Sequence, residues 1–120
     1  MARGRWIKPS LFSSLTVTRW PVPVRWTFVG LWTYCDDYGR GRDEPRLVKA
    51  EVWPLDDTVT VKKVTEHLAQ IEKTGPLCRY KVDGEDYLHI TSWGEHQKVS
   101  NPTTSTIPAC PTHENERSGS

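Results

Sequence analysis

The sequence predicts a small α+β domain, and three observations support this fold class. Residues 60–74 carry apolar side chains at the spacing of one helical face, and Gly75-Pro76 follows directly as a helix stop. Residues 77–90 (LCRYKVDGEDYLHI) then show the pattern of a tight two-stranded β-hairpin. Two shorter helical patterns precede this pair. Such an order is the outline of a winged helix-turn-helix, whose third helix fits a DNA major groove.

The N-terminal segment is expected to supply a strand or arm and one short helix. Residues 3–8 (RGRWIK) are basic and predict a short edge strand or arm. Pro9 then opens a turn or short helix over the sequence PSLFSSL. Its three large apolar side chains are expected to pack inward: Leu11, Phe12 and Leu15.

The first full helix is expected to open at residues 20–23 (WPVP), because proline is tolerated in a first helical turn, where its missing N–H would be unpaired anyway. Apolar residues then recur at i, i+4, i+7 and i+11, which places them on one helical face. They are Val24, Phe28, Leu31 and Cys35. The helix is expected to end in the sequence CDDYG, in which Gly39 is the helix-breaking residue.

A second helix is expected over Pro45–Trp53, after a polar loop at Arg40–Glu44 and before Pro54, which stops it. Residues 54–57 (PLDD) would form the turn of the helix-turn-helix. Thr60 is a good N-cap for the third helix, Thr60–Thr74. The buried stripe of that helix is expected to be Val61, Val64, Leu68 and Ile71.

The hairpin admits two registers. A two-residue loop, Asp83-Gly84, pairs Val82 with Glu85 and leaves Leu88 and Ile90 on the face opposite Tyr80 and Cys78. A three-residue loop, residues 82–84 with Gly84 left-handed, instead keeps the even-numbered positions on one side. We favour this second register because it separates apolar from charged side chains. Its core face holds Cys78, Tyr80, Leu88 and Ile90. Its outer face holds Arg79, Lys81, Tyr87 and His89, with Lys81 opposite Glu85.

The segment after the hairpin divides the chain into a domain and a tail. Trp93 is expected to close the core behind the hairpin. Pro, Ser and Thr dominate from residue 99 onward, which predicts an extended or disordered tail over residues 99–120. Residues 1–98 would therefore form the winged helix-turn-helix domain.

Charge is balanced overall but unevenly distributed. The 120 residues have a formal net charge of +1, and their length is that of one domain. Residues 1–49 hold nine Lys/Arg against four Asp/Glu, whereas the remainder holds seven against eleven. A basic N-terminal half could face phosphate or could simply be a solvated face. The start of the chain lacks the apolar core of a secretory signal peptide, and no apolar run is long enough to span a membrane.

Three widely spaced cysteines, Cys35, Cys78 and Cys110, suggest no disulfide framework and fit a reducing compartment. Cys110-Pro-Thr-His113 together with His89 or His96 could in principle hold zinc, but without a CxxC pair we expect neither a metal site nor a cofactor.

Three groups of side chains are candidates for DNA contact. Residues of the third helix could read bases or contact phosphate, or could be an ordinary solvent face: Lys62, Lys63, Glu66 and Gln70. On the hairpin, Arg79 and Lys81 could reach the backbone, or could protect a strand edge from aggregation. Outside these elements, an N-terminal arm and the residues after the hairpin could contact DNA, or could be a solubilising end and a packed histidine: Arg3, Arg5, Lys8, His96, Gln97 and Lys98.

A catalytic role has little support in the sequence. The paired acids Asp36-Asp37 and Asp56-Asp57 could in principle bind a catalytic metal. They are better interpreted as helix-end and turn residues. The chain shows no Ser-His-Asp, HExxH or phosphate-loop pattern, so we do not expect an enzyme.

Four segments carry a resemblance to a known family: RWIKPSLF, FVGLWTYCDDYGR, LVKAEVWPLDD and YKVDGEDYLHITSWGEHQKVSNPT. In this order they resemble bacteriophage and prophage helix-turn-helix proteins, which are similar to the N-terminal winged-helix domains of phage replication-initiation (replisome-organiser-like) proteins. The resemblance covers roughly residues 3–103. Its strongest parts are Ile7–Pro9, Gly30–Asp37 and His96–Lys98. It implies DNA binding or recruitment of replication proteins in the bacterial host cytoplasm.

Two departures from that family shape the functional expectation. The chain stops soon after the hairpin, without the further C-terminal domain that many members carry. Lys62 and Lys63 stand in the first turn of the third helix, where acidic residues are common in such proteins. We therefore expect a small double-stranded DNA-binding protein, acting as a transcription regulator or replication accessory. The alternative is a winged-helix protein-interaction module that binds itself or a host replication or transcription factor.

Overall fold

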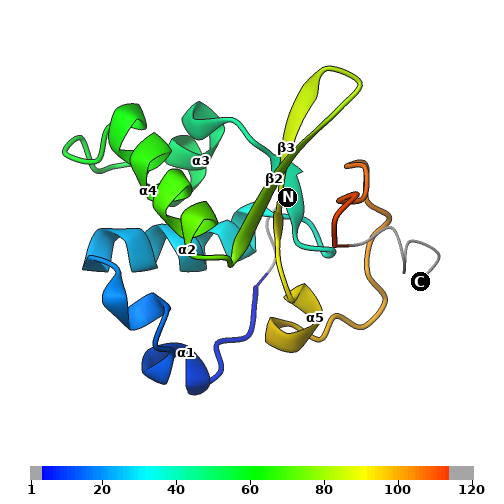
Figure 1. Cartoon of the computed structure of the whole chain (residues 1–120), viewed down its shortest axis with the longest axis horizontal. Coiled ribbons are helices and arrows are strands. Elements are labelled where there is room, and N and C mark those ends of the chain that lie inside the picture. Colours follow the sequence, from blue (N-terminus) through cyan, green and yellow to red (C-terminus); the bar gives the residue numbers. More distant parts are fainter. Residues whose placement is uncertain (1–3, 114–120) are drawn as a thin grey trace.

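The structure, a computed structural model, describes residues 4–113 and is an α+β domain, as predicted (Figure 1). Its helical elements, in chain order, are α1 (Ser10–Ser13), the 3₁₀ turn η1 (Val17–Arg19), α2 (Val22–Tyr34), α3 (Pro45–Val52), α4 (Val61–Lys73) and α5 (Trp93–His96). Its strands are β1 (Arg40–Arg42), β2 (Leu77–Val82) and β3 (Glu85–Ile90). Figure 1 shows α2, α3 and α4 gathered on one side of the sheet, and the orange and red part of the chain that precedes residue 114 on the other side.

The three full helices form where the periodicity predicts them. All four residues of the α2 stripe are buried, and Trp20 packs edge-on against Phe28, with ring centroids 5.3 Å apart. In α4, Thr60 is the N-cap, and its Oγ1 accepts a hydrogen bond from the backbone N–H of Lys63 at 3.2 Å. Three residues of the α4 stripe are buried: Val64, Leu68 and Ile71. The fourth, Val61, is exposed, so the expectation that it is buried is wrong.

The sheet has three antiparallel strands in the order β1-β3-β2, one more than the predicted hairpin. The additional strand, Arg40–Arg42, was expected to be part of a polar loop, and it pairs with β3 over Tyr87–His89. The predicted strand near the N-terminus is wrong for its described part, because residues 4–8 form no strand. A strand of three residues is too short to show a period of two, so only its pairing with β3 identifies it.

The preferred hairpin register is wrong, and the two-residue alternative is right. Val82 pairs with Glu85, and the loop consists of Asp83 and Gly84 alone. Both have positive φ values, 52° and 82°, which are typical of a type I′ turn. Leu77 and its partner Ile90 therefore share the core face with Leu88.

The physical reason for this error lies in the tail. Separating apolar from charged side chains selects a register only when one face of the sheet meets solvent, but here both faces are covered. The Tyr80 hydroxyl donates a hydrogen bond to the carbonyl of Pro108 at 2.7 Å, and Cys110 is fully buried. His89, expected on the outer face, is only 4% exposed. Residues 99–113 form no helix or strand, and they pack as part of the fold; residues 114–120 lie outside the described residues.

The expected inward packing of the N-terminal helix holds for one residue of three. Leu11 packs against the core, but Phe12 is 74% exposed and Leu15 is 73% exposed. With only four residues, α1 has a single turn and can direct only one side chain inward. An apolar surface is left over α1 and the start of α2.

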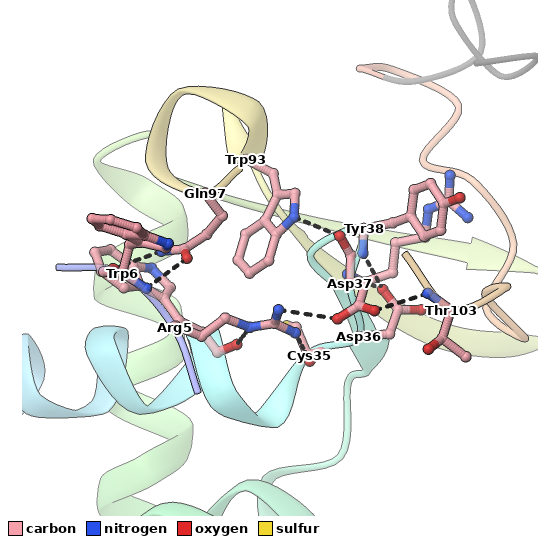
Figure 2. A network of polar contacts seen from close by, with 11 residues as sticks. Arg5, Trp6, Cys35, Asp36, Asp37, Tyr38, Trp93, Gln97 and Thr103 are labelled. Atoms are coloured by element: carbon pink, nitrogen blue, oxygen red, sulfur yellow. Dashed lines mark hydrogen bonds and ion pairs between the residues drawn. The ribbon is translucent and has the colours of Figure 1, made fainter. Parts of the chain in front are cut away.

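A buried polar network joins the N-terminal segment, the end of α2, α5 and the tail (Figure 2). Arg5 Nη1 lies 3.0 Å from Asp37 Oδ1, and both side chains are 5% exposed. The second carboxylate oxygen of Asp37 accepts from the Thr103 N–H at 2.9 Å, and its backbone carbonyl accepts from Trp93 Nε1 at 2.8 Å. Trp93 is buried here, as expected. The Arg5–Asp37 ion pair thus connects segments that are far apart in the sequence.

Candidate nucleic-acid interface

The outer face of α4 presents the side chains predicted to contact DNA. Lys62, Lys63 and Glu66 are exposed, and Gln70 is half-buried. Lys63 Nζ donates to the carbonyl of Thr58 at 3.0 Å, which turns this ammonium group toward the preceding loop. Within residues 4–113, Lys62 forms no ion pair. The face is therefore exposed and moderately basic.

The turn from α3 to α4 is held rigidly by hydrogen bonds. The Asp56 carboxylate accepts from the hydroxyl and the N–H of Thr58, and these bonds lower the pKa of Asp56. Lys49 Nζ donates to the carbonyls of Trp53 and Asp56, at 2.6 and 2.9 Å. Because both sides of the turn are fixed, the N-terminal end of α4 has a defined position relative to α3.

The inward side of α4 contacts α2 and α3 through a polar group. Trp53 Nε1 donates to Thr27 Oγ1 at 2.8 Å, and Thr27 Oγ1 lies 2.8 Å from Nδ1 of His67. Burial lowers the pKa of His67, which favours the neutral imidazole at neutral pH. His67 therefore positions the helix and does not add to its positive charge.

The cations of the hairpin have acidic partners within the chain. Arg79 forms an ion pair with Asp43, with Nη2 at 2.9 Å from Oδ1, and a longer one with Glu72 at 3.5 Å. Lys81 lies 2.7 Å from its cross-strand partner Asp86, whose carboxylate raises the pKa of Lys81. The hairpin thus presents largely neutralised charge, and Arg79 links the sheet to α4.

The expected N-terminal arm is wrong for Arg5, whose guanidinium is buried. Besides the Asp37 ion pair, it donates to the carbonyls of Trp32 and Cys35. Lys8 Nζ donates to the carbonyl of Glu95 on α5. Arg3 lies outside the described residues. The described part of the arm is therefore bound to the body of the protein.

The residues after the hairpin divide into packed and exposed side chains. Gln97, expected to contact DNA, is only 4% exposed, and its amide makes hydrogen bonds to the backbone N–H and carbonyl of Trp6. His96 stacks on Trp32, with ring centroids 5.5 Å apart, and burial lowers its pKa. These two residues have structural roles, whereas Lys98 is exposed.

The paired acids and the sulfur-containing residues occupy other parts of the molecule. The Asp36 carboxylate accepts from the N–H groups of Tyr38 and Arg40 and so holds the turn before β1. The three groups within residues 4–113 that lie close enough to bind one metal ion are Cys78, Cys110 and His113.

None of the described helices is long and apolar enough to cross a membrane.

Comparisons of this chain with protein-family models, with curated proteins and with solved structures found no match.

Proposed function

We propose that this chain is a small phage-type DNA-binding protein with a winged helix-turn-helix fold, in which α4 enters the major groove. The order of elements supports this: α2, α3 and α4 are followed directly by the β2–β3 hairpin, and β1 extends the hairpin into a sheet. The resemblance to phage replication-initiation and regulatory proteins favours a role as transcription regulator or replication accessory in the bacterial host cytoplasm.

The observation that carries the proposal is the exposed outer face of α4. A helix of 13 residues is about 20 Å long, and the major groove is about 12 Å wide, so α4 can lie along the groove. Lys62 and Lys63 in its first turn would contact phosphate or guanine, and Gln70 two turns later could contact adenine. Glu66 between them would accept a hydrogen bond from cytosine.

The neutralised hairpin makes α4 the main source of affinity. Lys81 and Arg79 would have to release Asp86 and Asp43 before binding phosphate, so they add little net attraction. The proposal therefore predicts moderate affinity that depends mostly on the lysines of α4.

The test compares two charge reversals of equal size by fluorescence anisotropy with duplex DNA. Lys62→Glu combined with Lys63→Glu should weaken binding more than about tenfold while the circular dichroism spectrum stays unchanged. The matched comparison is Lys8→Glu combined with Lys98→Glu, which changes the net charge equally at two other lysines that the sequence makes candidates for DNA contact. This second variant should bind more tightly than the α4 variant. Equal losses would contradict α4 as the main source of affinity.

The second candidate function is protein interaction, and the exposed apolar surface supports it. Phe12 on α1 and Trp26 on α2 are 74% and 60% exposed, and they line one apolar groove of about 220 Å³ together with Ile7 and Val22. A second copy of the chain is the first occupant to test, because helix-turn-helix dimers bind two half-sites; a host replication or transcription factor is the alternative partner.

Sedimentation velocity tests this candidate. Self-association that is lost in the variant Phe12→Ser/Trp26→Ser, while DNA affinity for a single half-site is retained, would support a dimer through this surface. A monomer at high concentration would contradict it.

A further inference from the structure

Four potential zinc ligands lie on the outer face of the sheet. Two of them belong to the strands, and two belong to the tail that covers this face. Cys78 on β2 and His89 on β3 are directly opposite each other in the antiparallel register. Because side chains alternate along a strand, both point away from the core face that holds Leu88. The tail crosses this outer face and brings Cys110 and His113 to the same place. Figure 1 shows this part of the tail, in orange and red, on the side of the sheet away from α4.

The tail is held over the sheet by contacts that precede the cluster. Arg40 Nη1 donates to the carbonyl of Ile107 at 3.2 Å, and the Tyr80 hydroxyl donates to the next carbonyl, that of Pro108. Cys110 lies two residues after Pro108 and is fully buried. The position of the Cys110 thiol is therefore fixed by the fold.

Two distances within the cluster are close to those of a tetrahedral zinc site. Cys110 Sγ lies 3.4 Å from Cys78 Sγ and 3.5 Å from His113 Nδ1, and the three ligand atoms all lie within 4.8 Å of one another. Zinc bond lengths of about 2.3 Å to sulfur and 2.0 Å to nitrogen place tetrahedral ligands about 3.5–3.8 Å apart. Only a small movement of His113, which is exposed, is needed to bring all three atoms onto one ion.

His89 is the candidate for the fourth ligand, outside the group of three atoms that lie within 4.8 Å of one another. Its ring centroid is 6.2 Å from that of His113, with an angle of 35° between the planes, and it lies opposite Cys78 on the neighbouring strand. Two thiolates and two imidazoles form a common structural zinc set, and four protein ligands leave no open position on the ion, which favours a structural role. We propose that Cys78, His89, Cys110 and His113 bind one structural zinc ion that fixes the tail to the β2–β3 hairpin.

A disulfide between Cys78 and Cys110 is the competing chemistry. The two sulfur atoms are 3.4 Å apart, well beyond the disulfide bond length of about 2.05 Å. Neither histidine would have a role in a disulfide. The third cysteine, Cys35, is buried in the helical core, where burial raises the pKa of its thiol, and it serves as an internal control.

The test measures zinc by elemental analysis in the full chain, produced in zinc-supplemented medium and purified by gel filtration under reducing conditions. We expect about one zinc ion per chain in the unchanged protein and in Cys35→Ala, and almost none in Cys78→Ser or Cys110→Ser. Cobalt substitution of the unchanged protein should give the absorption of a tetrahedral thiolate site. His89→Ala should alter that spectrum, and an unaltered spectrum would remove His89 from the ligand set.

Measurement on the unchanged chain decides the proposal even where a variant fails to fold. A protein without bound zinc whose three thiols all react with a thiol reagent after denaturation would overturn the site. A mass two hydrogens lower, with only one reactive thiol, would identify the disulfide and would also overturn it. Neither result bears on DNA binding, because the cluster lies away from α4.

Discussion

Removing the carboxylate of Asp37 should destabilise the fold strongly, although the sequence alone suggests only a helix-end residue at this position. In Asp37→Ala the Arg5 guanidinium stays buried without its counter-charge, and the Thr103 N–H loses its acceptor. Breaking one side of a buried ion pair typically costs about 3–5 kcal/mol, and both side chains here are 5% exposed. For a domain of this size, that loss lowers Tm by roughly 10–20 °C.

Urea unfolding followed by circular dichroism measures this loss, and a double-mutant cycle with Arg5→Ala measures the interaction itself. We expect the double variant to be more stable than the sum of the single losses implies, by more than about 1 kcal/mol. The control is the exposed pair Lys81–Asp86, with side chains 62% and 60% exposed. Asp86→Ala should cost less than about 1 kcal/mol. Equal losses in Asp37→Ala and Asp86→Ala would refute the reasoning from burial.

Three further substitutions test how the helices pack and titrate. Thr27→Val should cost about 1–3 kcal/mol in urea unfolding, because it leaves the indole N–H of Trp53 without its acceptor; a neutral effect would argue against that hydrogen bond. Burial lowers the pKa of His96, so the unfolded chain binds more protons, and stability should fall as the pH drops below about 6.5; His96→Phe should reduce this loss between pH 7.5 and 5, and an unchanged pH profile would contradict it. Gly30→Ala should destabilise the domain despite a helix-propensity gain of about 1 kcal/mol, because the new Cβ would lie 2.3 Å from Cγ1 of Val52; a higher Tm would show that the two helices separate without cost.

The helices could be predicted because their determinants are local. The α2 stripe, the Thr60 cap and the Gly-Pro stop after α4 act within a few residues of sequence, and each is present in the structure. The two-residue hairpin loop was among the alternatives for the same reason, since Asp83-Gly84 is a local turn pattern.

The sheet faces could not be predicted because a distant segment determines them. Cys110 and Pro108 cover the face that holds Tyr80 and His89, and no pattern within the hairpin indicates this cover. The short strand β1 is likewise defined only by pairing with β3, more than 40 residues away.

The candidate interface shows the same difference between features with local determinants and features that depend on distant residues. Exposure of Lys62 and Lys63 follows from the helical period of α4, whereas the burial of Arg5 depends on Asp37, 32 residues later in the sequence. Gln97 contacts Trp6 across 91 residues. Basic or polar composition alone therefore does not distinguish a DNA-contacting side chain from one that holds the fold together.

The salt dependence of DNA binding tests the central claim most directly. Fluorescence anisotropy with random 30-mer duplex DNA, followed by selection of a preferred site, gives both the electrostatic and the sequence-specific parts of the affinity. With roughly three phosphate contacts, we expect affinity to fall about 40-fold between 50 and 200 mM salt, and to sharpen on the selected sequence. No binding at low salt would contradict the placement of α4 in the major groove and would favour the protein-interaction function.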